Sequence, residues 1–334
     1  MDTMKIRALT IFFVSEDMDK LVKYVDQLQN IKDEVVWTKR IAFPPELKDL
    51  ERKVNQIPSG KGIIYSIIHR RAKDELRSIA DFLSTDKSFY ASVLLNDSKY
   101  IDDVAQLVYS LDPEIATRVA ILVNEEFLTT PYFPVGSANT INDSLSSSLI
   151  YVREFEENRA ERVLAFADEY SKKISKEIGI RYLGIDASLS PWMEESTGRL
   201  IENLSGEKMF SFGQLSTVAN INRRIFELVW RLKIAPIGFS ELMLPVAEDN
   251  VLMERVREGS LTLSQLMTLT SVCVAGLDMI AVKRDIELYK KILRDSMAIQ
   301  FTKRRPYGIR IIPSTGEGEI YLKEYGKIPE IKII

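Results

Sequence analysis

The acidic residue best placed for chemistry is Asp186, because it follows a short apolar run and precedes a turn rich in hydroxyl groups. The run Arg181–Ile185 is predicted to be a strand, and Ser188 and Ser190 follow the aspartate before Pro191. In α/β proteins, ligands and catalytic groups gather where a strand ends and the next helix begins. We therefore predict that Asp186 is a general acid or base, with the two serines binding the ligand. A carboxylate in such a turn could instead accept hydrogen bonds from nearby backbone amides.

A second acid, Glu241, follows the apolar run Ala235–Phe239 in the same way. Parallel strands would bring Asp186 and Glu241 to one edge of a sheet, where we predict that both are catalytic. Carboxylates there could exchange protons with a substrate or hold Mg²⁺ or Mn²⁺. Glu194 is also predicted to bind the ligand, from the first turn of a helix that Pro191 is expected to begin. The helix dipole alone is an equally good reason for an acid at that position.

Cationic groups that suit an anionic substrate flank the predicted last strand. Arg305 and Arg310 could each bind a carboxylate or phosphate in a bidentate manner, or form a salt bridge to one of the acids. His69, at the end of the third predicted strand, is included among the ligand-binding candidates, although a structural hydrogen bond would explain it as well. Because His69 is the only histidine, one chain cannot supply a multi-histidine metal site.

The composition predicts a globular protein without an affinity for nucleic acid or membranes. Of the 334 residues, 46% are hydrophobic and 28% are charged, and the net charge is −3. No apolar run is long enough to span a bilayer, and the first residues lead into a predicted strand without a signal-peptide pattern. One cysteine fits a reducing cytoplasm, where we expect the protein to act. The abundance of Lys, Glu, Arg and Ile is typical of thermophilic proteins.

Strand-like runs alternate with helical patterns along almost the whole chain, which predicts an α/β fold with parallel strands in a single domain, residues 1–334. The ten runs are Ile6–Val14, Val35–Phe43, Gly62–Ile68, Phe89–Leu95, Arg118–Val123, Ser147–Val152, Arg181–Ile185, Ala235–Phe239, Leu277–Val282 and Tyr307–Ile312. Residues 318–333 are predicted to form a C-terminal β-hairpin.

The alternation is interrupted once, between Thr129 and Ser148. A loop of this length within a compact domain is usually a binding loop or a lid. It could equally be a surface connection that Tyr132 and Phe133 anchor in the core.

Several stretches resemble an uncharacterised family known as domain of unknown function 711, also called uncharacterised protein family 0210. They are Gly184–Ser196, Leu244–Asp249, Gly259–Leu263, Ser271–Ala281 and Ile309–Pro313, with the N-terminal strand Ile6–Thr10. The resemblance implies a ten-stranded α/β barrel like that of the glycyl radical enzymes, and a homodimer. It implies no activity, because the family has none assigned. Radical chemistry would need a reactive cysteine and a glycine-loop motif, but Cys273 lies in an apolar run and the surroundings of Gly308 do not match that motif.

From the residues we expect an enzyme of small-molecule metabolism that uses carboxylate acid/base chemistry on an anionic substrate, with possible help from Mg²⁺. One alternative is a non-catalytic protein that binds or senses a metabolite. The other is a structural assembly module.

Overall fold

The computed structural model describes residues 5–15, 17–32, 34–47, 53–273 and 276–334 of the chain. Its main feature is a mixed sheet of eight strands in the order β7-β6-β1-β2-β3-β4-β5-β9. The strands are β1 (Ile6–Phe12), β2 (Val36–Ala42), β3 (Ile63–Arg71), β4 (Phe89–Leu95), β5 (Val119–Val123), β6 (Ser144–Leu149), β7 (Arg181–Asp186) and β9 (Tyr307–Ile309). The predicted α/β class is confirmed.

The five strands from β1 to β5 run parallel to one another, as the alternation of strands and helices predicts. The sheet changes direction on both sides of this block, because β6 pairs antiparallel with β1 and β9 pairs antiparallel with β5. β7 then lies parallel to β6. In β1 every residue is buried, including the charged Arg7. A charge in a buried strand needs a partner, and this one contributes to the cavity described below.

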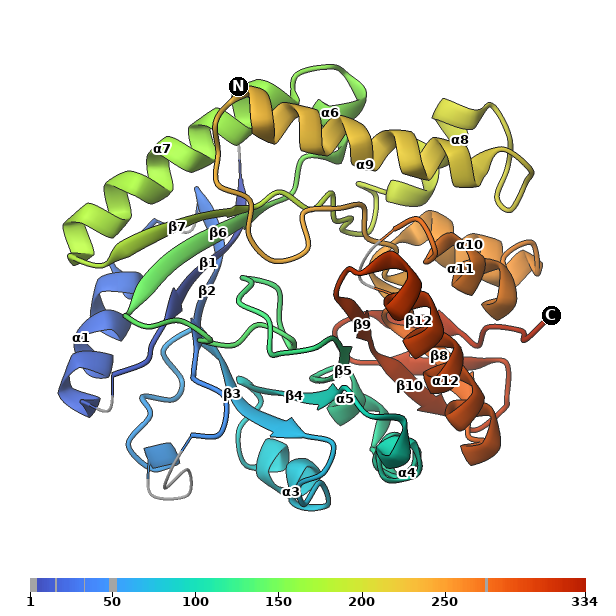
Figure 1. Ribbon diagram of the computed structural model, residues 1–334, viewed down its shortest axis with the longest axis horizontal. Helices are drawn as coiled ribbons and strands as arrows, with labels where there is room; N and C mark the ends of the chain where they lie inside the picture. Colours follow the sequence, from blue (N-terminus) through green and yellow to red (C-terminus); the bar gives the residue numbers. More distant parts are fainter. Residues whose placement is uncertain (1–4, 16, 33, 48–52, 274–275) are drawn as a thin grey trace.

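Helices cover the outer side of the sheet and the region beyond β9 (Figure 1). The α-helices of the described residues are α1 (Met18–Gln29), α3 (Ser78–Thr85), α4 (Ile101–Ser110), α5 (Pro113–Ala116), α6 (Val152–Glu156), α7 (Ala160–Ile178), α8 (Thr197–Ser205), α9 (Gln214–Arg231), α10 (Asn250–Glu258), α11 (Leu263–Leu269) and α12 (Ile286–Lys303). Short 3₁₀ turns are η1 (Ser98–Tyr100) and η2 (Val246–Glu248). None of the helices in these described parts has the length and apolar character needed to cross a bilayer.

The long segment between β5 and β6 lies inside the arc of strands, in the middle of Figure 1. Residues 130–138 are all buried. Tyr132 and Phe133 belong to two small apolar clusters on this inner side of the sheet. The segment is therefore neither a lid nor a surface connection. The rings of Tyr132 and Phe133 are anchored in the core, as one of the two predictions stated. Both rings also line the cavity described in the next section, which is the position expected of a binding loop.

The structure does not show the ten-stranded barrel that the sequence leads us to expect. The sheet is not closed within the described residues, because its edge strands β7 and β9 do not pair with each other. The predicted strand Ala235–Phe239 touches β7 through a single bridge, between Ile185 and Pro236. The bridge consists of hydrogen bonds from Ile185 to Ala235 and from Ile237 to Ile185, and Gly238 then turns the chain away with φ +63°. The likeness to the glycyl radical barrel is not confirmed.

Strands outside the main sheet form two small pairs. The predicted strand Tyr307–Ile312 is divided at Arg310, so that its second part, β10 (Ile311–Ser314), pairs in parallel with β8 (Ile280–Lys283). The predicted C-terminal hairpin is confirmed as β11 (Glu319–Leu322) and β12 (Gly326–Pro329), which pair antiparallel.

The helix expected to begin at Pro191 begins later. Trp192 and Glu195 exchange backbone hydrogen bonds of 3.1 Å in a tight turn, and α8 starts at Thr197. Ser196 is its N-cap and accepts a hydrogen bond from the amide of Arg199. Glu194 consequently precedes the helix and does not lie in its first turn.

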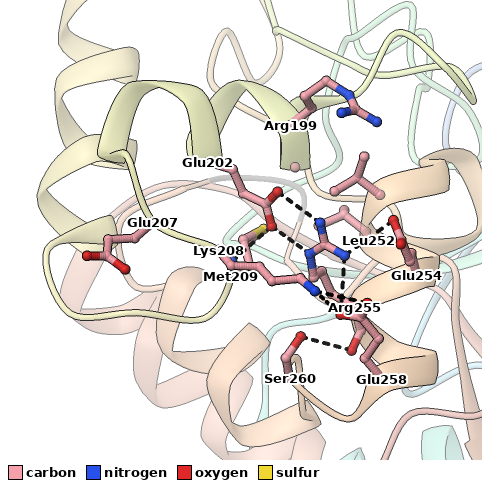
Figure 2. A network of polar contacts seen from close by, with 12 residues as sticks. Arg199, Glu202, Glu207, Lys208, Met209, Leu252, Glu254, Arg255, Glu258 and Ser260 are labelled. Atoms are coloured by element: carbon pink, nitrogen blue, oxygen red, sulfur yellow. Dashed lines mark hydrogen bonds and ion pairs between the residues drawn. The ribbon is translucent and has the colours of Figure 1, made fainter.

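An ion-pair network joins α8 to α10, as Figure 2 shows. Arg255 binds Glu202 through two bonds, Nε–Oε1 at 2.6 Å and Nη2–Oε2 at 3.0 Å. Glu258 accepts from Arg255 at 3.2 Å and pairs with Lys208 at 2.8 Å. Since each of these charges has a partner in the described structure, we assign the network to the stability of the fold.

Candidate functional site

A cavity of about 90 Å³ lies between the inner side of the sheet, the buried β5–β6 segment and the tip of the C-terminal hairpin. We call it the arginine cavity. Its lining residues are Arg7, Trp37, Thr38, Arg40, Ile64, Tyr90, Tyr132, Phe133, Ser190, Trp192, Met243, Pro245, Glu248, Asp278, Arg310, Glu324 and Tyr325. A single water needs roughly 10–15 Å³, so this space holds several water-sized groups.

Two arginines and two acids form a buried ionic floor in the cavity. Arg7 and Arg310 each donate to one oxygen of Glu248, at 2.5 and 2.9 Å. Arg310 also binds both oxygens of Asp278. Burial favours the neutral form of Glu248, but the charges of the two arginines and their hydrogen bonds hold its pKa below the usual value. For Asp278 burial prevails over Arg310, and the nearby Glu248 adds to the effect, so its pKa is raised.

Aromatic rings hold Arg7 in place over this floor. Its guanidinium carbon lies 5.8, 5.9 and 5.7 Å from the ring centres of Trp37, Tyr132 and Trp192. Nη1 donates to the carbonyl of Pro191 at 2.7 Å. Trp37 and Trp192 also pack edge to face, with ring centres 4.8 Å apart. Arg7 is thus engaged by hydrogen bonds, by an ion pair and by three aromatic rings. It forms part of the cavity wall and is not free to bind a ligand.

Arg40 on β2 differs from the other two arginines because it has no acidic partner in the described residues. Nε donates to the hydroxyl of Thr38 at 2.9 Å, and Nη1 donates to the carbonyl of Pro131 at 3.0 Å. The described residues offer no acceptor to Nη2. Burial, followed by the charge of Arg7, lowers the pKa of Arg40 to about 10, which leaves it cationic at neutral pH. A half-buried guanidinium without an ion-pair partner could be balanced by an anion.

Glu324, in the turn of the hairpin, is the acidic group at the mouth of the cavity. It is exposed to solvent and forms no ion pair with the described residues. Partial burial and the charges of Glu248 and Glu114 raise its pKa, against the opposing charges of Arg310 and Arg40. Tyr325 beside it packs on Trp192, with ring centres 6.1 Å apart.

A smaller space of about 40 Å³ continues from the cavity; we call it the apolar annex. It shares Tyr132, Phe133, Met243, Asp278 and Arg310 with the arginine cavity. Its remaining lining residues are Ala120, Pro134, Val135, Phe239, Gly308 and Ile309, none of which carries a polar side chain.

Asp186, the leading sequence candidate, does not line either space. Its Oδ1 accepts hydrogen bonds from the amide and hydroxyl of Ser188, at 3.1 and 2.6 Å, and from the amide of Ser240 at 2.9 Å. Its Oδ2 accepts from the hydroxyl of Thr130 at 2.6 Å and from the amide of Phe239 at 2.9 Å. Burial raises the pKa of Asp186 although all of these bonds oppose the rise. The carboxylate joins three segments of the backbone, which is the alternative that the sequence also left open.

Glu241 and Arg305 lie together but outside the cavity. Arg305 Nε donates to Glu241 Oε1 at 2.9 Å, and 44% of the Arg305 side chain is exposed. Burial raises the pKa of Glu241, although the charges of Lys303 and Arg305 oppose the change. The two predicted acids are close in the fold, since the amide of Glu241 donates to the Ser188 hydroxyl at 3.3 Å. They do not converge on one space.

The other predicted ligand-binding residues divide between the cavity and the scaffold. Ser190 and Arg310 line the cavity. Glu194 is exposed and accepts a hydrogen bond from Asn250. His69 is buried, bonded to Ser92 at 2.7 Å, and burial lowers its pKa to about 4. In the described residues, no three His, Cys, Asp or Glu side chains are grouped to hold a metal ion, and the Mg²⁺ or Mn²⁺ expectation stays a prediction.

Arg7, Arg40 and the aromatic wall were missed by reasoning from the sequence. A signal was present for Arg7, because it is the one charged residue in the strand-like run Ile6–Phe12, whose residues are all buried; Val36–Ala42 contains both Lys39 and Arg40 and gives a weaker signal. Glu248 was also missed: it lies directly before Asp249, which caps α10, and its side chain enters the cavity floor. Cys273 is fully buried, and burial raises the pKa of its thiol to about 12, in agreement with its prediction as a core residue.

Comparison with known proteins connects the chain to proteins without an assigned activity. The family model described as Uncharacterised ACR (DUF711) matches residues 134–321, more than half of the chain. A UPF0210 protein of Sulfurisphaera tokodaii is 23% identical in an alignment that covers 97% of this chain and 87% of that protein. For a UPF0210 protein of Clostridium acetobutylicum the figures are 25%, 92% and 82%.

A third relative aligns over a shorter stretch. A UPF0210 protein of Methanosarcina acetivorans is 29% identical over 57% of this chain, and the match spans only 42% of the length of that protein. The family match includes Glu248, Asp278 and Arg310 of the cavity floor, whereas Arg7, Arg40 and Glu324 lie outside it. The chain therefore belongs to the uncharacterised DUF711 family.

Proposed function

We propose that the arginine cavity binds a small anionic metabolite and that Arg40 is the residue that holds the anion. The supporting observation is the unpaired guanidinium. Arg7 and Arg310 are neutralised by Glu248 and Asp278, whereas Arg40 has only a hydroxyl and a carbonyl as partners in the described residues. A carboxylate or phosphate on the ligand would accept a hydrogen bond from Nη2 and balance the buried charge.

Glu324 is the group that we assign to acid/base chemistry on this ligand. It is the one carboxylate among the described lining residues that has no cationic partner at ion-pair distance, and its pKa is raised above the ordinary glutamate value. A carboxyl group that no cation engages is able to exchange a proton with a ligand beside it. In this proposal Asp186 and Glu241 shape the segments behind the cavity and do not touch the ligand.

A metabolite-binding protein without catalysis is the second candidate. It is favoured by the floor of the cavity, where Glu248 and Asp278 are both fully engaged by arginine. The two candidates differ in the role of Glu324. If the protein is an enzyme, Glu324→Gln should abolish turnover while the ligand still binds. If the protein only binds the ligand, the same substitution should change the affinity for the ligand and nothing else. The homodimer and the cytoplasmic location stay predictions.

Calorimetric titration with acetate and with inorganic phosphate tests the anion site. We expect saturable binding of at least one of them to the wild-type protein, weakened tenfold or more in Arg40→Met. Arg40→Lys keeps the charge but loses the planar fork, so it should have intermediate affinity. Arg305→Met is the matched control, because Arg305 is an arginine outside the cavity. The proposal fails if neither anion binds, or if Arg40→Met, still folded by circular dichroism, binds as the wild type does.

A further inference from the structure

We infer that the ligand is an amphipathic monoanion, a monocarboxylate whose short aliphatic body enters the apolar annex. This inference rests on the proposed function and adds the class of ligand. Four features of the described residues carry it: the position of the annex, its apolar lining, the charge of the cavity lining, and the size of the annex.

The ring of Phe133 places the annex next to the anion site. It lines both spaces, and its centre lies 5.3 Å from the guanidinium carbon of Arg40. A carboxylate held by Arg40 therefore has the entrance of the annex beside it. The body attached to that carboxylate would continue past Phe133 toward Val135 and Phe239.

The annex can accept an apolar group without leaving a charge unpaired. Its two charged lining residues, Asp278 and Arg310, bind each other through both carboxylate oxygens. Every other lining side chain except the Tyr132 hydroxyl is apolar, and that hydroxyl donates to Ser190 at 3.0 Å. An apolar body would thus replace water against surfaces that make no hydrogen bonds.

The charge of the described lining favours one negative charge on the ligand. The whole lining holds three guanidinium groups and three carboxylates, those of Glu248, Asp278 and Glu324. Glu248 and Asp278 pair with Arg7 and Arg310, and Glu324 is exposed to solvent, so Arg40 is the lining cation without an ion-pair partner in the described residues. A carboxylate would balance Arg40, whereas a phosphate dianion would bring a second negative charge close to Glu248 and Asp278.

The size of the annex limits the body to a few carbons. A volume of about 40 Å³ is roughly three water-sized positions, so about three methylene groups fit. Each methylene that leaves water should tighten binding roughly fourfold. For ligands with a longer body than the annex can hold, the gain in affinity per methylene should stop or reverse.

Calorimetric titration of the full chain with acetate, propionate, butyrate, pentanoate, hexanoate and benzoate tests the inference. We expect affinity to rise roughly fourfold per carbon and to level off near pentanoate, with benzoate, whose ring is larger than the annex, below pentanoate, and phosphate the weakest. Gly308→Ala is the informative variant. A Cβ at this position would lie 3.6 Å from Phe239 and 3.7 Å from Val135, which is ordinary contact, so the methyl group narrows the annex without a clash.

In Gly308→Ala, pentanoate should lose about fourfold or more in affinity, whereas acetate, which needs only Arg40, should bind as before. Acetate in the same variant is therefore the matched control for folding. If affinity is flat along the series, or if Gly308→Ala weakens acetate and pentanoate equally, the inference is overturned while anion binding through Arg40 stands. If no anion binds at all, both proposals fall.

Discussion

Arg7 and Glu248 form an ion pair in the interior, with Nη2 and Oε2 2.5 Å apart and side-chain exposures of only 8% and 5%. Since Arg310 occupies the other oxygen of the same carboxylate, Glu248 connects β1 to the segment that joins β9 and β10. The carboxylate neutralises two cations whose side chains are only 8% and 10% exposed. This arrangement leaves Arg40 as the cation available to a ligand.

Replacement of Glu248 by Gln should destabilise the fold severely. The change leaves two buried guanidinium groups without their shared counter-charge, a class of loss that costs about 3–5 kcal/mol. Urea denaturation at pH 7 measures it. The matched control is Glu157→Gln, which removes a pair whose side chains are about half exposed (48% and 47%) and should change stability by no more than about 1 kcal/mol. Similar costs for the two variants would contradict the role given to Glu248.

The cost of Glu248→Gln should also depend on pH. Because the pKa of Glu248 is lowered in the folded state, its contribution is fully present above the ordinary glutamate pKa. The contribution is lost as the pH falls through the folded-state value, where the carboxyl group takes up a proton. The difference between wild type and variant should therefore shrink in acid.

Asp186→Asn should reduce stability by about 2–4 kcal/mol, because an amide NH₂ group would replace an oxygen that only accepts hydrogen bonds. Whichever carboxylate oxygen it replaces, this NH₂ group would face buried hydrogen-bond donors, among them the hydroxyl of Thr130 and the amides of Phe239 and Ser240. Thermal or urea unfolding measures the loss. Glu241→Gln is the control, since its partner Arg305 is substantially exposed and the expected change is within about 1 kcal/mol. A stable Asp186→Asn protein that has lost anion binding would instead support a direct role for Asp186 at the ligand.

Gly238→Ala should destabilise the protein more than Gly206→Ala, although both glycines have positive φ, +63° and +71°. A Cβ at Gly206 meets no atom within 4 Å, so that variant reports only the cost of the left-handed conformation, about 1–2 kcal/mol. A Cβ at Gly238 would lie 2.1 Å from Asp186 Oδ2, so the carboxylate must move and lose its hydrogen bonds. Denaturation of both variants measures the difference, and equal losses would show that Asp186 moves without cost.

His69 should make the protein sensitive to mild acid. Burial lowers its folded-state pKa to about 4, against an ordinary value of 6.5, so between these values the unfolded chain binds a proton that the folded chain does not. The stability from the neutral imidazole is therefore complete above pH 6.5 and falls as the pH drops toward 4, by about 3 kcal/mol in total.

The measurement is simple because His69 is the only histidine in the chain. Its imidazole proton resonances should stay constant down to about pH 5 in the folded protein and should titrate near 6.5 in urea. In His69→Gln, stability should fall less between pH 6.5 and 4 than in the wild type. Titration of the folded protein near 6.5 would contradict the prediction.

The elements with strong local signals could be predicted from the sequence. β4 has the bounds that its apolar run gives, and Gly179 ends α7 in the left-handed conformation. The helix start at Pro191 was wrong, because a proline can begin a turn as well as a helix, and the hydroxyl of Ser196 caps α8 five residues later. The eighth run could not become a strand beside β7 once Pro236 and Gly238 interrupted it.

The site was harder to predict because its contacts join distant parts of the chain. Asp186 looked free in the sequence, but its partners Thr130 and Phe239 lie 56 and 53 residues away. Arg310 and Ser190 do line the cavity, but their predicted role in ligand binding stays a prediction. Arg40 could not be distinguished from other basic residues, because what singles it out is a missing counter-charge, which only three-dimensional packing reveals.

The walls of the arginine cavity come from residue 7 at one extreme and residue 325 at the other. While a ribosome is still making this chain, the inner face of β1 and β2 has no Glu248, Arg310 or Tyr325 to enclose it. Under the proposed function, a metabolite could therefore not assist the early stages of folding by binding. The cavity is complete only after the hairpin packs against Trp192, so ligand binding would require the folded chain.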